Sequence, residues 1–278
     1  IDMVLNSGQY ELESDFKYVW SENNKYGKEM IFALLHETGN NAAEIACHFG
    51  PSDHPEVPGR WQYYGVSLPF WRSYDKEDPR REFFYYDYTG DAKRDDQSDY
   101  GFHYMVPEEG VTVVPNDTTK YMQNVATMKY TYDMISDAYY DGRTICIFRL
   151  SDVILCKAEI ENNLNGPAAA LPYLNQIRAR AGAPEYGKHN RFPAPSTKEA
   201  MNDAILKERG YELVFEFQRR ADLIRFGKYE EVVNAHLKKL GIAQPTNVTS
   251  SLRYFPYPLN DAQLNPNLAA ENPSRLPK

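Results

Sequence analysis

Apolar residues recur at helical spacing between residues 145 and 241, and this pattern predicts four helices. The first is expected to run from about Ile145 to Leu164. The Asn-Gly-Pro stretch at 165–167 should end it and begin the second, because glycine is common just past a helix end and proline at a helix start. Gly182 should end the second helix. The short connection between the two predicts an antiparallel helical hairpin.

Two further helices are expected after a loop that contains three prolines. Ser196 precedes Glu199 by three residues, a capping-box pattern that predicts the start of a long third helix reaching about Phe226. The fourth has the most regular apolar stripe and should end at Gly241. The stripe consists of Tyr229, Val232, Val233, His236, Leu237 and Leu240. Because His236 lies on it, we expect this side chain to pack in the core.

The apolar runs of the first 140 residues are short and irregular, and Tyr, Asp, Pro and Gly separate them. Residues 2–7 predict the end of a helix that Gly8 stops. Residues 29–35 predict a short buried strand or a helical turn, and residues 83–88 a strand with rings on both faces. The charged stretch 91–99 is expected to be a solvated loop.

The chain therefore divides into three parts that differ in composition and in the pattern of apolar residues. Residues 1–140 are rich in loops, residues 145–241 are helical, and residues 242–278 are extended and proline-rich. We expect a mainly α protein with helical hairpins, a large irregular loop region and a few short strands. The loop-rich part is the expected ligand-binding part, because it contains a dense aromatic cluster between residues 61 and 74.

Composition excludes several classes of protein. The 278 residues suffice for one large domain or two small ones, and 31 basic against 39 acidic residues give a net charge of −8. An acidic chain repels phosphate, which argues against binding nucleic acid or a charged membrane surface. The 22 Tyr, 13 Phe and 3 Trp exclude a disordered polymer. The three cysteines, Cys47, Cys146 and Cys156, lack metal-ligand spacing and are expected to be buried free thiols.

A series of short motifs occurs in order along the chain. They are residues 7–12 (SGQYEL), 78–80 (DPR), 149–159 (RLSDVILCKAE), 174–182 (LNQIRARAG), 208–227 (ERGYELVFEFQRRADLIRFG), 257–259 (YPL), 264–268 (LNPNL) and 271–273 (ENP). In this order they resemble the signatures of the SusD/RagB family of outer-membrane nutrient-binding lipoproteins. Each motif is weak alone, but together they cover nearly the whole chain.

The resemblance implies a fold with tetratricopeptide-like helical hairpins and a non-catalytic function at the bacterial cell surface. The protein would capture an oligomeric nutrient, usually a glycan, as an oligosaccharide or polysaccharide. It would pass this ligand to a SusC-like, TonB-dependent outer-membrane transporter that it covers as a lid. Family members carry a signal peptide, a lipidated cysteine and N-terminal helices, which the sequence lacks before Cys47. We therefore expect a C-terminal portion whose full-length form meets the membrane only through a lipid anchor.

Three acidic residues of the third helix, Glu208, Glu212 and Glu216, are spaced four apart on one face. Basic residues surround them, so opposite charges can pair at spacings of three and four residues. We expect these charges to fix the packing of the helix, with Arg178 and Arg180 as structural partners of the acids. Catalytic carboxylates are the alternative.

The aromatic cluster between residues 61 and 74 carries the most informative chemistry. In an extended segment Trp61 and Tyr63 point the same way and Tyr64 oppositely. Rigid rings with a few polar neighbours suit the apolar faces and hydroxyl edges of sugars. The candidate ligand-binding residues are Trp61, Gln62, Tyr63, Tyr64, Trp71 and Arg72. The alternative is a local core beneath long loops, which we favour for Phe70 and Trp71.

Motifs typical of enzymes are missing from the sequence. It contains no Gly-x-Ser-x-Gly elbow, no phosphate-binding loop and no zinc-type His-Glu-x-x-His. A metal site could be imagined at Cys47, His48, Asp53 and His54, but such a loop histidine pair is more often incidental. We therefore expect no catalysis, no metal and no cofactor. Two alternatives to glycan binding stay open: an oligopeptide-binding member of the same family, or a helical-repeat scaffold that binds only proteins.

Overall fold

The computed structural model describes residues 1–39, 42–51, 54–57, 61–90, 101–111, 118–133, 141–239, 248–265 and 267–268. The contacts divide the chain into two compact units, Ile1–Glu216 and Phe217–Lys278. The loop-rich residues and the first helical hairpin, which the sequence separates by texture, thus belong to the same unit. The charged stretch 91–99, which we expect to be a solvated loop, lies outside the described residues.

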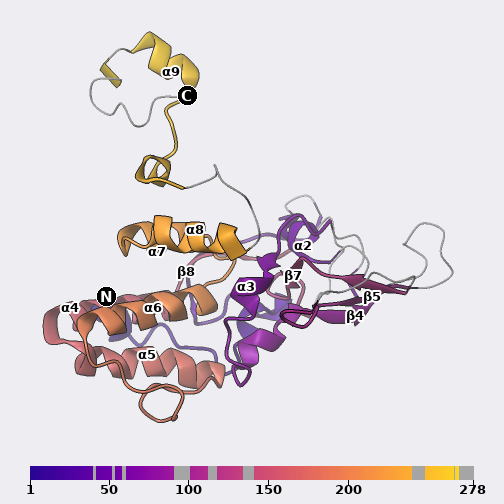
Figure 1. The fold of residues 1–278 in the computed structure, drawn as a ribbon. Coiled ribbons are helices and arrows are strands. Elements are labelled where there is room, and N and C mark those ends of the chain that lie inside the picture. Colours follow the sequence, from indigo (N-terminus) through magenta and orange to yellow (C-terminus); the bar gives the residue numbers. More distant parts are fainter. Residues whose placement is uncertain are drawn as a thin grey trace. The chain divides into compact units, whose positions relative to one another are not determined.

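Three helices lie side by side in the first unit: α4 (Leu150–Asn165), α5 (Pro167–Ala181) and α6 (Lys198–Glu212) (Figure 1). The first two form the predicted hairpin, with Gly166 between them. Gly182 follows α5 with a φ of 72°, a left-handed conformation that glycine adopts easily because it has no Cβ. The predicted ends of these two helices are confirmed.

The predicted start of the first helix at Ile145 is wrong. Residues Ile145–Arg149 form strand β8, which pairs antiparallel with β1 (Met30–Leu34), and α4 begins only at Leu150. A partner strand that is distant in the sequence therefore decides between helix and strand at these residues. A strand or a helical turn was predicted for residues 29–35, and β1 confirms the strand. The expected burial is wrong, because Phe32 and Leu34 are exposed.

The third helix begins near the predicted residue but is much shorter than expected. The side chain of Thr197, rather than Ser196, caps it by accepting a hydrogen bond of 3.1 Å from the Ala200 N–H. The helix ends at Glu212 instead of about Phe226.

The end of α6 at Glu212 has a physical cause, because side chains take its carbonyl oxygen. Lys129 Nζ and Arg149 Nη2 donate to this oxygen at 2.9 and 2.8 Å. In a continuing helix the N–H of Glu216 would occupy the same position. Phe215 instead adopts a φ of 61°, and the chain leaves the helix. The turn brings the Glu216 carboxylate to Lys129 and Arg149, both of which bind it.

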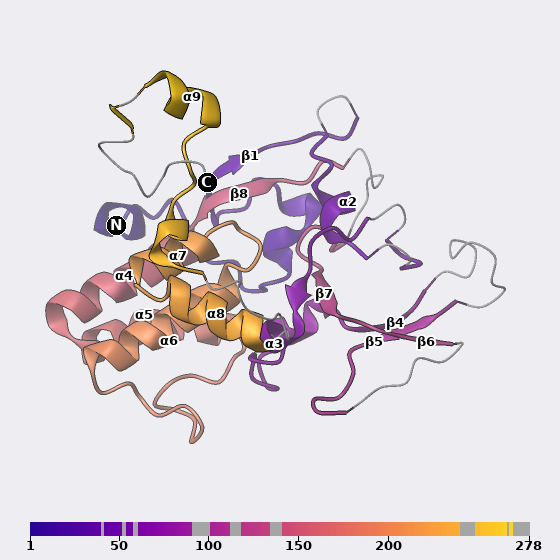
Figure 2. The same ribbon diagram turned by 45° about the horizontal axis from the view of Figure 1, so that its top comes forward.

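Small sheets and short helices make up the loop-rich part (Figure 2). One sheet has the order β2 (Val66–Ser67), β7 (Asn124–Thr127), β3 (Phe84–Tyr85). Another has the order β4 (Asp87–Thr89), β5 (His103–Met105), β6 (Thr119–Tyr121), with β5 and β6 parallel. The single strand predicted for residues 83–88 is therefore split between β3 and β4, which belong to different sheets.

The remaining elements of the first unit are short. The α-helices are α1 (Asp2–Leu5), α2 (Ile45–Phe49) and α3 (Leu68–Trp71), and the 3-10 helices are Tyr18–Trp20, Glu22–Asn24 and Pro79–Glu82. An apolar core lies under these loops, formed by Phe16, Val19, Trp20, Ile45, Phe49, Phe83, Tyr130 and Cys146. Cys47 and Cys146 are buried free thiols as expected, whereas Cys156 is only half-buried.

A cluster of buried charges joins the helices to the loop-rich part. Its members are the basic residues Arg80, Lys129, Arg149, Arg178 and Arg180 and the acidic residues Glu29, Asp78, Glu208, Glu212 and Glu216. Each side chain is at most 5% exposed. The expected structural role of Arg178 and Arg180 is confirmed, since Arg178 binds Glu208 at 2.6 Å and Arg180 binds Glu212.

The partners of the α6 carboxylates come from distant parts of the chain, not from positions three or four residues away. Arg80 lies 2.9 Å from Glu212, and Arg149 lies 2.7 Å from the same carboxylate. Burial by itself would raise the pKa of Glu212, but the positive charges of Arg180, Arg149 and Arg80 outweigh burial and hold this pKa well below its usual range. Glu212 is therefore ionised at neutral pH and serves the fold.

The second unit contains α7 (Arg219–Arg225), α8 (Tyr229–Lys239), a 3-10 helix (Ser250–Arg253) and α9 (Leu259–Leu264). The predicted fourth helix is confirmed as α8, although its predicted stop at Gly241 lies outside the described residues. His236 is only half-buried, so its expected core position is wrong. Within the described residues of both units, no helix combines the length and apolar character needed to cross a membrane.

Candidate functional site

The short helix α2 forms the base of the candidate site. The chain enters α2 through Glu44, whose φ is 53°, and the Ala46 N–H donates to the Asp141 carboxylate at 3.1 Å. Asp141 is fully buried, and its backbone oxygen also accepts from the Ala43 N–H at 2.9 Å. The end of α2, with His48 and Phe49, is therefore held in a fixed position against the core.

The segment that carries the predicted aromatic residues lies against the end of α2. The Trp61 N–H donates to the Cys47 carbonyl oxygen at 2.6 Å, and the Tyr64 N–H donates to the His48 carbonyl oxygen at 3.2 Å. Gly65 then connects this segment to β2. Hydrogen bonds on one side and sheet pairing on the other fix the backbone of residues 61–65.

The three predicted rings of this segment gather around His48. The centroid of the His48 ring lies 5.0 Å from that of Trp61, 5.5 Å from that of Tyr63 and 6.3 Å from that of Tyr64. Trp61 and Tyr63 lie on the same side as expected, with centroids 5.4 Å apart. The extended conformation on which the expected direction of Tyr64 depends is wrong, because Gln62 has a φ of 50°.

These rings are exposed although a rigid base supports them. Trp61 is 39% exposed, Tyr63 66% and Tyr64 56%. Beneath Tyr64 lies the buried Phe49 ring at 5.3 Å, which itself contacts the Tyr130 ring at 4.9 Å. We call Trp61, Tyr63, Tyr64 and His48 the aromatic platform. Exposed rings on a fixed base present apolar surface that can bind a ligand with little loss of side-chain entropy.

Polar groups accompany the platform. Gln62 Nε2 lies 3.5 Å from Asn124 Oδ1, which places its amide beside β7. The Nδ1 atom of His48 is buried and has no hydrogen-bond partner among the described residues. No sequence pattern groups His48 with the rings, because hydrogen bonds between separate segments create this contact. No cluster of three or more metal-ligating side chains occurs within the described residues, which exclude Asp53.

The structure does not bring Trp71 and Arg72 to the platform. Trp71 is only 5% exposed, and its Nε1 donates to the Arg81 carbonyl oxygen at 3.1 Å. The Arg81 guanidinium lies 4.1 Å from the centre of the Trp71 ring. Arg72 is half-buried and donates to the Pro107 carbonyl oxygen. The core position that we favour for Trp71 is thus confirmed and its ligand-binding role is wrong, because α3 turns this ring into the core. Arg72 supports a loop.

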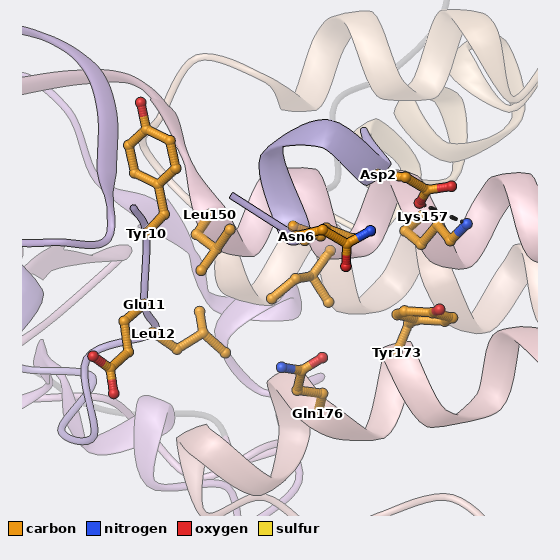
Figure 3. A pocket seen from close by; sticks show the side chains of 11 residues that line it. Asp2, Asn6, Tyr10, Glu11, Leu12, Leu150, Lys157, Tyr173 and Gln176 are labelled. Carbon is orange, nitrogen blue, oxygen red and sulfur yellow. Dashed lines mark ion pairs between the residues drawn. The ribbon is translucent and has the colours of Figure 1, made fainter. Parts of the chain in front are cut away.

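A separate hollow of about 630 Å³ lies between α1, α4 and α5 (Figure 3). Its lining comprises Asp2, Leu5, Asn6, Tyr10, Glu11, Leu12, Leu150, Ile154, Lys157, Tyr173 and Gln176. The Lys157 ammonium already binds Asp2 at 2.8 Å and Glu161 at 2.9 Å. The Lys157 ammonium of this hollow is thus already neutralised, and the aromatic platform is the stronger candidate site.

Comparison with known proteins identifies the family. A model of the SusD family matches residues 28–274, so the chain belongs to the SusD family. SusD-like protein P25 of Formosa agariphila is 39% identical over 120 residues, which cover 43% of this chain and 22% of that protein. The starch-binding protein SusD of Bacteroides thetaiotaomicron is 28% identical over 137 residues, which cover 49% of this chain and 22% of that protein.

Solved structures confirm a mainly helical fold with small sheets. A SusD homologue from Bacteroides thetaiotaomicron is 25% identical, with a TM-score of 0.70 over 94% of this chain and 56% of that chain. Surface glycan-binding protein A from the same species, in complex with laminarihexaose, is 21% identical, with a TM-score of 0.66 over 95% of this chain and 56% of that chain. The chain thus spans little more than half the length of these structures. The tetratricopeptide-like character of its hairpin stays a prediction.

Proposed function

We propose that this chain binds an oligosaccharide at the aromatic platform without breaking its bonds. The observation that carries the proposal is the exposure of Trp61, Tyr63 and Tyr64 on a fixed base. The apolar C–H faces of a sugar can stack on such rings, and the hydroxyl groups at its edge can bind polar neighbours. Membership of the SusD family supports the proposal, as does the laminarihexaose complex of one structural neighbour.

The position of the candidate catalytic carboxylates supports binding without turnover. The three acids of the predicted charged face, Glu208, Glu212 and Glu216, are at most 3% exposed and bind basic side chains. A glycosidase needs two carboxylates that reach the scissile bond from a cleft. These three cannot do so while they hold the fold together, and the platform itself consists of three aromatic residues and a histidine.

The cellular setting of the proposal comes from the family. Glycan captured at the platform would be delivered to a SusC-like, TonB-dependent transporter in the bacterial outer membrane. The full-length protein would be a surface lipoprotein, with contact to the membrane through its lipid anchor only.

Calorimetric titration with a panel of oligosaccharides tests the binding. Trp61→Ala, Tyr63→Ala and Tyr64→Ala should each weaken binding of the tightest ligand about fivefold or more, since stacked aromatic residues contribute over about 1 kcal/mol each at binding sites. Tyr26→Ala is the matched control, because Tyr26 is 76% exposed outside the platform. Its affinity should equal that of the wild type.

Three results would contradict the proposal. Normal binding by all three platform variants would place the site elsewhere. Tighter binding of oligopeptides than of any glycan would favour the peptide-binding alternative. Release of reducing ends by the purified wild type would show an enzyme.

A further inference from the structure

His48 occupies an unusual position at the centre of the aromatic platform. Its ring is half-buried and lies within 6.3 Å of the rings of Trp61, Tyr63 and Tyr64. The buried Nδ1 atom has no hydrogen-bond partner among the described residues, although the residue as a whole is only half-buried. The polar His48 ring therefore lies among three exposed aromatic rings. Within the described part of the chain, its buried Nδ1 lacks the hydrogen-bond partner that buried polar atoms normally have.

Packing alone does not explain a histidine at this position. A phenylalanine of similar shape would contact the same three rings and would leave no polar atom buried without a partner. A buried polar group without a partner costs about 1–3 kcal/mol. The free protein is therefore expected to be less stable with histidine at this position than with phenylalanine. A buried polar atom without a partner calls for an explanation other than packing, and the other ring nitrogen, Nε2, is the atom of His48 that a ligand could reach.

We propose that His48 is the specificity-determining residue of the platform, which hydrogen-bonds a ring hydroxyl of the bound sugar through Nε2. The inference rests on the proposed function and deepens it. Stacked rings recognise the apolar face of any pyranose, but they discriminate poorly between epimers. A single fixed nitrogen can discriminate, because a hydroxyl pointing the other way leaves that nitrogen unpaired. A hydroxyl both donates and accepts, so either neutral tautomer of His48 can bind it.

The backbone keeps His48 where this role requires it. Its carbonyl oxygen accepts the Tyr64 N–H at 3.2 Å, and the preceding residue, Cys47, accepts the Trp61 N–H at 2.6 Å. The following residue, Phe49, is 5% exposed and packs against Tyr130. The imidazole is therefore fixed relative to the rings before a ligand binds, which a directional hydrogen bond needs in order to select one hydroxyl orientation.

The test compares His48→Phe with Trp61→Ala and the wild type by calorimetric titration. The probes are gluco- and galacto-configured hexasaccharides, with laminarihexaose as the first of the gluco series. His48→Phe should bind the preferred epimer roughly 3- to 10-fold more weakly, as expected for one lost hydrogen bond. Its preference between the epimers should fall by the same factor. Its melting temperature should equal or exceed that of the wild type, because the ring packing is retained. For the same reason, the tryptophan emission spectrum of the free protein should match that of the wild type.

The outcomes separate this inference from the proposed function. If Trp61→Ala loses binding while His48→Phe keeps both the affinity and the epimer preference of the wild type, His48 is a packing residue and the inference is wrong. If the wild type binds none of the probes, or if Trp61→Ala binds them normally, the platform is not a glycan site and both proposals are wrong. A fall in the melting temperature of His48→Phe, together with equal losses for both epimers, would indicate a structural role and also overturn the inference.

Discussion

Replacing Arg149 by methionine tests whether the buried charges hold the first unit together. Arg149 is fully buried and makes five hydrogen bonds, to Glu29, Glu212 and Glu216. The cluster pairs five basic with five acidic side chains, so the variant leaves one negative charge buried without compensation. Breaking a buried ion pair in this way costs about 3–5 kcal/mol. That is a large fraction of the roughly 5–15 kcal/mol that stabilises a typical domain.

Urea unfolding at pH 7, followed by circular dichroism, measures this cost. Arg191→Met is the matched control, because Arg191 also binds two carboxylates, Asp75 at 2.8 Å and Glu77 at 2.6 Å, but its side chain is 47% exposed. An exposed pair is worth only about 0–1 kcal/mol. Arg149→Lys retains the charge and should lie between the two. A cost below about 1 kcal/mol for Arg149→Met would refute the reasoning, since that is the exposed-pair range.

Three more predictions follow from the structure. The pKa of Glu212 and that of Glu216 lie below the usual 4.5, because neighbouring basic residues outweigh burial, so the stability they contribute is present above pH 4.5. Unfolding curves between pH 6 and 3 should show that stability falling with pH, and a constant free energy of unfolding would contradict it. Burial lowers the pKa of Lys129 from 10.5 to about 8, so the unfolded chain holds this proton more tightly and the contribution of Lys129 to stability should rise from pH 8 to 10.5. Lys129→Met should abolish that rise, and equal slopes for variant and wild type would disprove the assignment. Gly65→Ala places a Cβ in steric conflict with Asn124 Oδ1 and should weaken glycan binding by displacing the platform, whereas unchanged titrations would contradict this prediction.

The sequence predicted those elements whose signals are local. The glycine and proline at 166 and 167 mark the turn of the α4–α5 hairpin, and Gly182 marks its end. Both signals work through the conformation of the residue itself, which depends little on the rest of the fold. The predicted spacing of Glu208 and Glu212 also identified the charged face of α6, although not its partners.

The errors occur where distant segments decide the local structure. Strand β8 is paired by β1, and α6 ends at Glu212 because Lys129 and Arg149 take its carbonyl oxygen. No pattern within a window of the sequence contains this information. Trp71 is a candidate ligand-binding residue for which we favour a core position, and the structure places it in the core.

The part of the candidate site that was predicted from the sequence is the part that comes from one short segment. Trp61, Tyr63 and Tyr64 are adjacent in the sequence, and their composition points to a surface for stacking. His48 is missing from that prediction, because the Trp61 and Tyr64 N–H groups bring α2 to these rings only in the folded chain.

The central claim is that the exposed rings of the platform bind a glycan that the protein does not cleave. Affinity electrophoresis tests it most directly, with the wild type, Trp61→Ala and Tyr26→Ala run in native gels that contain one plant, host or microbial polysaccharide each. We expect one polysaccharide to retard the wild type and Tyr26→Ala equally, to leave Trp61→Ala unretarded and to release no reducing ends. Retardation of Trp61→Ala equal to that of the wild type, or no retardation by any polysaccharide, would contradict the account.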